Sequence, residues 1–342
     1  MRQAHAKTYP GLDLVRLGAA LCVAIYHLGY WCWRDVPAYQ MPRLIPFVSF
    51  GWVGVEIFFV ISGFVIAFSA TGKTAPAFVR SRAARLYPAV WICATTTAVI
   101  VGPSLNAYWR SLTLFPVGPW VDGAYWTLPI EMVFYSIIAI ALWRSWPLSR
   151  VALGLGIYSC LFWTLKLINL PLGLVDFSVM ESNEGYLLLP HFGVYFALGM
   201  VLYLRRGLIQ GMVFLVFGLI AATWRSHAMH IPGAPFYVAP LVWLIAVLLI
   251  TLSVFRNNVM VEKLGRWPIR TLGLMTYPLY LLHTEIGQAV MLKIPKPPLA
   301  FVTAILVLLG LAFAVLPLER AIRHLLPTRV QRESALPTGN PL

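Results

Sequence analysis

The chain consists of long apolar runs separated by short polar connections that contain proline or glycine. Each run is close to the roughly 20 residues that an α-helix needs to cross a bilayer, and much longer than a membrane β-strand. The pattern therefore predicts an all-α fold, a polytopic membrane helical bundle with about ten transmembrane helices. The expected spans are 11–33, 48–70, 86–103, 126–144, 150–168, 186–204, 209–225, 235–254, 271–292 and 298–317.

The composition supports a membrane protein. Hydrophobic residues make up 60% of the 342 residues and charged residues only 11%, which is too apolar for a water-soluble domain of this length. The net charge of +14 does not indicate nucleic-acid binding, because the basic residues form short clusters between the apolar runs. We expect membrane lipids around the protein and no nucleic acid. The four cysteines show no ligand spacing, so we expect no metal site.

The lysines and arginines separate onto two sides of the predicted bundle. Of the 26, 18 fall on one side and 6 on the other, while Arg16 and Lys166 lie inside spans. The positive-inside rule then predicts that both termini are cytoplasmic. We expect one integral-membrane domain over residues 1–330, without a cleavable signal peptide, and a disordered cytoplasmic tail over residues 331–342.

The first span carries two ionisable side chains, Arg16 and His27. At 100° and 1.5 Å per residue they project from nearly the same face of a helix, roughly 16 Å apart along its axis. One interpretation is structural, with Arg16 reaching lipid phosphates and His27 hydrogen-bonded in the packing. The other is functional, because an ionisable group inside a membrane span is a candidate site by default. Such a face can hold an anion at one end and move a proton at the other.

Two acidic residues lie in other spans. Glu56 is near the outer end of the second span, and Glu131 lies about one and a half turns into the fourth. Glu56 has two open interpretations: a surface ion pair with Arg34 or Arg43, or orientation of a buried histidine such as His27. Glu131 is a functional candidate because it is ionisable and inside the membrane.

A basic cluster precedes the third span in the segment FVRSRAARLYPAVW, with Arg80, Arg82, Arg85 and Tyr87. Arg82 and Arg85 are three residues apart and share a helical face. The cluster is an ordinary orientation signal or a phosphate clamp, since guanidinium groups bind phosphate through two parallel hydrogen bonds. In the ninth span, LGLMTYPLYLLHTEIG places Tyr280 beside His283, an ionisable residue at mid-membrane to outer depth.

Five segments of the chain resemble the acyltransferase-3 family, the integral-membrane O-acyltransferases that modify bacterial surface glycans and some small molecules. They read LDLVRLGAALCVAIYH, GVEIFFVISGFVI, RSRAARLYP, YWTLPIEMVFY and LGLMTYPLYLLH, in the same order as in the family. The resemblance implies a ten-helix protein of the bacterial inner membrane. It also implies transfer of an acyl group from cytoplasmic acyl-CoA, most often acetyl-CoA, to a hydroxyl of a surface or exported glycan or a lipid-linked saccharide.

The resemblance also implies roles for individual residues. Arg16 and His27 match the essential arginine and histidine of the family, and Arg82 and Arg85 match its cytoplasmic arginine motif. Glu131 matches the acidic position after the Trp-Ser/Thr-Leu element. Many members have a second acid directly after it, where this chain has methionine, so no role for a second carboxylate carries over.

These considerations give a mechanistic hypothesis. His27 acts as general base on the acceptor hydroxyl, Glu56 or Glu131 sets its tautomer, and the arginines hold the phosphates of CoA. The residues expected to be catalytic are His27, Arg16, Glu131 and Glu56; those expected to bind the donor are Arg82, Arg85, Arg80, Tyr87, Tyr280 and His283. Direct transfer is favoured because no serine or cysteine nucleophile is evident, and an acyl-histidine intermediate stays open.

The acceptor is expected to bind at the outer face. Trp109, Trp120, Tyr125 and the acidic segment 176–184 are candidates for contacts with sugar, although aromatic residues at a membrane interface also serve as anchors. Two other functions remain alternatives at this point. One is a transporter or flippase of a glycan or lipid-linked intermediate, and the other is a non-catalytic subunit of a glycan assembly complex.

Overall fold

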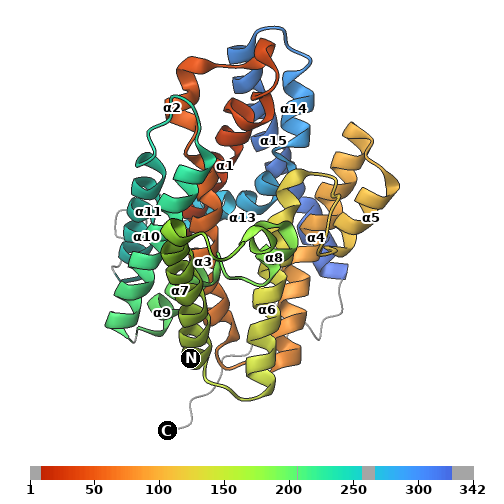
Figure 1. Ribbon diagram of the computed structural model, residues 1–342. Coiled ribbons are helices and arrows are strands. Elements are labelled where there is room, and N and C mark those ends of the chain that lie inside the picture. The colour runs from red at the N-terminus through yellow and green to blue at the C-terminus, as the bar shows by residue number, and fades with distance from the viewer. Residues whose placement is uncertain (1–8, 206, 256–265, 326–342) are drawn as a thin grey trace.

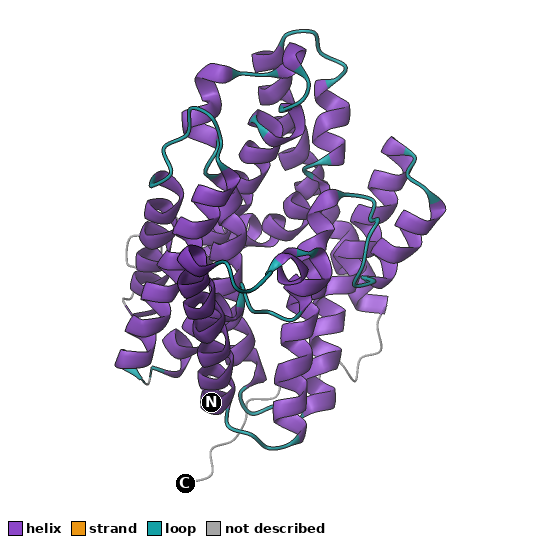
Figure 2. Ribbon diagram, in the orientation of Figure 1, coloured by secondary structure: helices purple, strands orange, loops and turns teal. Residues whose placement is uncertain are grey.

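The computed structural model describes residues 9–205, 207–255 and 266–325, and within these ranges the secondary structure is helical, without strands (Figure 2). Eight of the described helices are long and apolar enough to cross a membrane. They are α1 (Pro10–Gly29), α3 (Gly54–Ala70), α4 (Ala75–Val101), α6 (Thr127–Trp143), α7 (Leu148–Leu172), α10 (Leu208–Met229), α11 (Val238–Phe255) and α15 (Pro297–Leu325). The predicted polytopic helical membrane fold is confirmed. The tail predicted over residues 331–342 lies outside the described residues.

The other two expected spans are not continuous helices. The span 186–204 contains only the 12-residue helix α9 (Gly193–Leu204), preceded by the short helix α8 (Asn183–Leu187). Between them Leu189 has a positive φ of 63°, and Pro190 follows without an N–H to continue a helix. The span 271–292 is divided into α13 (Arg266–Leu282) and α14 (Glu285–Met291). The prediction of one continuous helix over each of these two spans is therefore wrong.

Short helices also occupy the connections between spans. The connection after α1 contains α2 (Ile45–Val48), and the one before α6 contains α5 (Leu105–Thr113). Hydropathy does not predict α5, because its mean hydropathy is low and its apolar residues do not form a continuous run. Figure 1 shows α5 standing to one side of the bundle beside α4.

Helix α3 is the central element of the bundle. In the apolar window that includes it, 78% of the residues are buried, compared with 22–44% in the other seven membrane-spanning candidates. It packs against α1, α6, α9 and α11. The ribbon in Figure 1 shows the long helices running roughly side by side around it, in an elongated bundle.

Glycines allow α3 to approach its neighbours at backbone distance, as the sequence predicts for small residues in membrane helices. A methyl group on Gly63 would lie 2.1 Å from the carbonyl oxygen of Phe196 in α9, and one on Gly199 would lie 2.0 Å from the carbonyl oxygen of Val60. Gly54 faces the backbone of α1 in the same way. The contact of α3 with α9 is therefore glycine against backbone on both sides.

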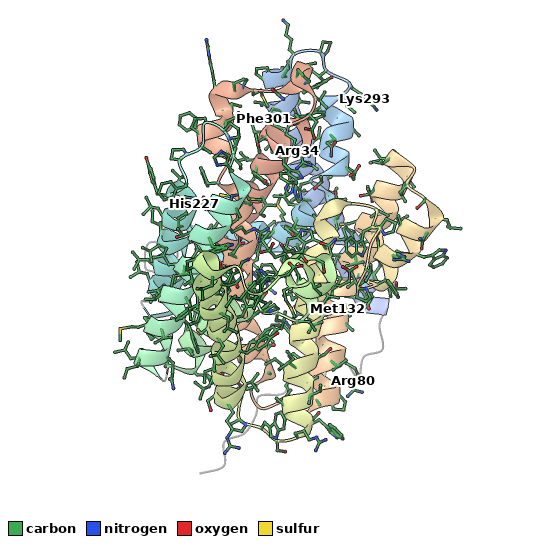
Figure 3. The ribbon with its side chains drawn as sticks, in the orientation of Figure 1. Arg34, Arg80, Met132, His227, Lys293 and Phe301 are labelled. Carbon is green, nitrogen blue, oxygen red and sulfur yellow. The ribbon has the colours of Figure 1, made fainter. Side chains whose placement is uncertain are left out.

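The ends that carry most of the basic residues lie together. The hydroxyl of Tyr203, at the end of α9, donates to the hydroxyl of Thr71 after α3 over 2.9 Å. In Figure 3, Arg80 lies toward this lower end, which we call the basic end, whereas Arg34 and Lys293 lie toward the upper end. The helices therefore alternate in direction as the charge distribution predicts, and the cytoplasmic assignment of the basic end stays a prediction.

The packing of α3 against α9 generates a prediction. Gly199→Ala places a methyl group against a backbone carbonyl, so the helices must separate, and we expect a loss of about 1–3 kcal/mol in stability. Gly310→Ala is the matched control, because a methyl group there meets no atom within 4 Å. Thermal unfolding of both variants in detergent measures the difference. Equal midpoints for Gly199→Ala and the wild type would contradict the close packing.

Candidate active site

Helices α1 and α13 run side by side in the same direction. Near the basic end, a methyl group on Gly273 would lie 2.5 Å from the carboxyl carbon of Asp13. Toward the other end, Nε2 of His283, directly after α13, is 3.0 Å from Nδ1 of His27. Because each helix advances about 1.5 Å per residue, the two contacts fix the relative position of the helices over several turns. The two histidines thus meet although 256 positions separate them in the chain.

A cavity of about 410 Å³ lies between α1, α3, α4, α6 and α13. Its walls are mostly apolar and hydroxyl-bearing side chains. Six charged residues also line it: Arg16, Arg82, Arg85, Arg270, Asp13 and Glu131. Four guanidinium groups against two carboxylates give the cavity a net positive charge, and the arginines lie toward its basic end.

Three of these arginines have no hydrogen-bond or ion-pair partner for their side chains in the part of the chain that the structure describes. Within the described ranges, the guanidinium groups of Arg16, Arg82 and Arg85 neither donate a hydrogen bond nor form an ion pair. Nε of Arg82 is buried without any partner. A buried charged donor is unfavourable unless it is paired and hydrogen-bonded. The cavity therefore presents unused donors to an anionic ligand, and the phosphates of CoA have the required chemistry.

Glu131 belongs to this cavity and not to the histidine pair. The hydroxyl of Ser62 in α3 donates to Oε1 of Glu131 over 2.7 Å. The next residue, Met132, labelled in Figure 3, packs into a hydrophobic cluster. The interpretation that Glu131 sets the tautomer of His27 is therefore wrong, because the contacts of Nδ1 of His27 are with other groups.

The histidine contacts determine where the protons lie. Nδ1 of His283 is 2.8 Å from the carbonyl oxygen of Tyr280, which only accepts, so this nitrogen carries the proton. Nε2 of a neutral His283 then accepts, and Nδ1–H of His27 donates to it and to the carbonyl of Val23, each at 3.0 Å. With both rings neutral, this is the one placement of the protons in which each of the three contacts has a donor. It leaves the lone pair of His27 on Nε2, as a general base requires.

Asp122 is a buried residue of the site that the sequence reasoning missed. Its Oδ2 accepts from the backbone N–H groups of Thr284 at 3.1 Å and Glu285 at 3.0 Å, and its Oδ1 from that of Ala124 at 2.8 Å. Burial raises the pKa of Asp122 to about 6, so at neutral pH it is mainly the accepting carboxylate. In a continuous helix these N–H groups would donate to backbone carbonyls of the preceding turn. The carboxylate of Asp122 accepts from them instead, which fixes the helix break directly after His283.

Tyr280 lies between the cavity and the histidine pair. It lines the cavity, and its hydroxyl is 2.9 Å from that of Thr127. Its ring centroid is 5.5 Å from that of His283. Neither His27 nor His283 is among the cavity-lining residues. Polar side chains are thus found along the path from the arginines past Tyr280 to the histidines. His283, expected to bind the donor, contacts His27.

Glu56 does not contact the histidines either. Its Oε1 accepts from Nη1 of Arg225 in α10 over 2.8 Å, and its side chain is 1% exposed. Both interpretations of Glu56 are therefore wrong: it forms no surface pair with Arg34 or Arg43, and it does not orient His27. Arg34 pairs with its neighbour Asp35 instead. The sequence pattern placed Arg225 at the outer end of the expected span 209–225, among the basic residues of that side, and gave no sign of this pairing.

Two expected donor-binding residues lie outside the cavity lining. Arg80 is exposed on α4 (Figure 3), two residues after the buried Phe78. The hydroxyl of Tyr87 donates to the backbone carbonyl of Thr113 over 3.4 Å. Because Arg80 and Tyr87 do not share the face of Arg82 and Arg85 on α4, only the latter pair reaches the cavity.

Comparison with known proteins gives a consistent result. The acyltransferase domain of the acyltransferase-3 family matches residues 9–318. An O-acetyl transferase of Shigella phage Sf6 is 29% identical over 153 residues, which cover 38% of this chain and 44% of the relative. The exopolysaccharide production protein ExoZ of Rhizobium meliloti is 30% identical over 126 residues, covering 30% and 39%.

A third relative is nodulation protein 10 of Rhizobium leguminosarum bv. viciae, 28% identical over 166 residues, which cover 39% of this chain and 45% of the relative. The chain thus matches less than half the length of each of these curated relatives. No solved structure matches it. The family model nevertheless covers nearly all of the described helices, and the arginine-lined cavity and the histidine pair both lie within it. The chain therefore belongs to the acyltransferase-3 family of membrane proteins.

Proposed function

We propose that this protein is a membrane O-acyltransferase that moves an acetyl group from cytoplasmic acetyl-CoA to a hydroxyl of a cell-surface or exported glycan. The observation that carries the proposal is the set of partner-free arginines in a cavity that extends toward the His27–His283 pair. The family match supports an acyltransferase over a transporter or a non-catalytic subunit. The names of two relatives, an O-acetyl transferase and an exopolysaccharide production protein, support a glycan as acceptor.

The donor binds in the cavity with its nucleotide at the basic end. Arg82 and Arg85, with Arg16, hold the phosphates through charge-assisted hydrogen bonds. The narrow pantetheine arm lies between apolar walls, and the buried hydroxyl of Tyr277, which has no partner among the described residues, hydrogen-bonds to it. The thioester then lies against Tyr280, and opening of the contact between Tyr280 and Thr127 brings it to the histidine pair.

His27 supplies the acid–base chemistry. Its Nε2 takes the proton of the acceptor hydroxyl while the hydroxyl oxygen attacks the thioester carbonyl carbon. The carbon–sulfur bond breaks, CoA leaves as a thiolate, and the proton on Nε2 passes to the thiolate. Nδ1–H stays bound to His283 throughout, so the ring keeps its orientation and its positive charge is shared with a hydrogen-bonded neighbour.

The proposed topology places this chemistry across the bacterial inner membrane. With the basic end in the cytoplasm, the donor enters from the cytosol and the acceptor from the opposite side. Both termini are then cytoplasmic. Reporter fusions to the loop of residues 71–74 and to the connection after α1 would report opposite sides of the membrane if this orientation holds.

Replacement of the base is the first test. We expect His27→Ala to insert and to bind acetyl-CoA normally but to lose transfer by about 10²–10⁴-fold, the usual contribution of a general base. The measurement is radiolabelled acetyl transfer from acetyl-CoA to extracted surface glycan by purified protein. Transfer at a near-normal rate by His27→Ala would remove the histidine from the mechanism.

The arginine clamp has a matched control on the same helix. Arg82→Ala combined with Arg85→Ala should weaken acetyl-CoA binding by about 10- to 100-fold, because charge-assisted hydrogen bonds to phosphate are lost. Arg80→Ala removes one positive charge from the exposed face of α4 and should leave affinity unchanged. Titration of each variant with acetyl-CoA compares them. Equal weakening in all would indicate a general surface-charge effect and exclude the clamp.

A further inference from the structure

A second pocket, of about 220 Å³, lies between α3, α7, α9 and α10, under the connection that contains α8. Glu56, Lys166, Glu181, His191 and Arg225 supply its charged and titratable groups. Glu56 is in the first turn of α3, and Arg225 is in the last turns of α10. Both positions are at the end opposite to the basic end. The pocket reaches the surface at Glu181, which is 48% exposed, so it opens on the side opposite to the proposed donor entrance.

The charges of this pocket are balanced. Arg225 pairs with Glu56 at 2.8 Å, and Lys166 pairs with Glu181. The first cavity has the opposite character, since Arg16, Arg82 and Arg85 have no hydrogen-bond or ion-pair partner for their side chains among the described residues. A pocket whose cations are already neutralised has no excess charge for a nucleotide or a phosphate, and therefore suits a neutral ligand.

Two buried polar atoms nevertheless have no partner among the described residues. They are Oε2 of Glu56, whose residue is 1% exposed, and Nδ1 of His191, whose residue is 8% exposed. Both residues line the pocket. A buried polar atom without a hydrogen bond costs free energy, so each atom favours a ligand that brings a hydrogen-bonding group. A hydroxyl satisfies both, because it donates to a carboxylate and either donates to or accepts from an imidazole nitrogen.

Aromatic rings form most of the remaining wall. The lining includes Trp163, Trp224, Tyr186, Phe192 and Tyr195. The ring centroids of Trp163 and Trp224 are 6.3 Å apart, and the amine of Lys166 lies 4.9 Å from the ring of Trp224. A sugar ring has the matching chemistry, with C–H faces that pack on aromatic rings and hydroxyls around its edge. The volume is below the roughly 300–1,000 Å³ of drug-sized ligand sites, so it suits a single ring.

Helix α3 separates the two cavities. Val55 lines the first cavity, and the next residue, Glu56, lines the second. Phe59, also in the first cavity, has its ring centroid 4.9 Å from that of Phe192 in the second. Ligands in the two cavities are thus one helix apart, so a ring in the second pocket is a neighbour of the glycan ring that accepts the acetyl group and not that ring itself.

We propose that the second pocket binds one neutral sugar ring of the acceptor, with Trp163 and Trp224 forming adjoining walls against its C–H groups and Glu56 and His191 hydrogen-bonding its hydroxyls. The inference rests on the proposed function, because it identifies the acceptor as a glycan. It gives Glu56 a role in acceptor binding instead of the expected catalytic one. Glu181, in the acidic segment that is a candidate for sugar contacts, lines the same pocket.

Direct binding measurements test the proposal without depending on catalysis. The probes are neutral methyl hexopyranosides of the gluco, galacto, manno and 6-deoxy-manno series. Their binding to the full-length protein in detergent is measured by saturation-transfer NMR. At least one should show saturable transfer to its ring protons. Trp224→Ala and Glu56→Gln should each weaken that binding by about tenfold. Two control variants should bind as the wild type does. They are Trp143→Ala, which removes a 71% exposed tryptophan outside the pocket, and His27→Ala.

Acetyl-CoA affinity serves as the folding control. It should stay at the wild-type value in Trp224→Ala and Glu56→Gln, because the donor cavity is separate. The proposal is overturned if no glycoside binds saturably, or if correctly folded Trp224→Ala binds like the wild type. Transfer of acetyl to extracted surface glycan separates the two proposals: glycoside binding without transfer to the glycan contradicts the proposed function alone, and transfer with an unchanged acceptor KM in Trp224→Ala contradicts the sugar pocket alone.

Discussion

The parallel contact of α1 with α13 is the constraint on which the site depends. Near the basic end it requires Gly273, because Asp13 occupies the space of a side chain there. At the other end it brings His27 to His283. A shift of either helix by one turn, about 5.4 Å, would separate the two rings and remove the lone pair of His27 from its defined position. The break after α13, held by Asp122, completes this constraint because it sets where His283 points.

Charge inside the bundle is distributed differently in the two cavities. In the first cavity, Arg16, Arg82 and Arg85 have no hydrogen-bond or ion-pair partner among the described residues, so their donors are available to a ligand. In the second, each cation is paired with a carboxylate, and aromatic rings fill the remaining wall. Unpaired buried charge is costly in a medium of low dielectric constant, so this difference between two cavities on either side of α3 points to ligands of different charge.

The central position of α3 explains how two such cavities fit in one small bundle. Its glycines bring the backbones of α1 and α9 close, and the residues between the glycines are left to line cavities on opposite faces. Ser62 and Val55 face the first cavity, and Glu56 faces the second. A bulkier helix interface would leave less room for both.

The sequence by itself determined the fold class, the alternation of the helices and most of the chemistry-bearing residues, because hydropathy, charge distribution and family motifs are local properties of the chain. Arg16, Arg82, Arg85 and Glu131 were identified in this way, and the structure brings them to one cavity. Only the tertiary structure decided which groups are partners. The pairs His27 with His283 and Glu56 with Arg225 join residues 256 and 169 positions apart, and no local pattern encodes such contacts. The broken helix after Leu282 was also decided there, because its cause, Asp122, lies in a distant loop.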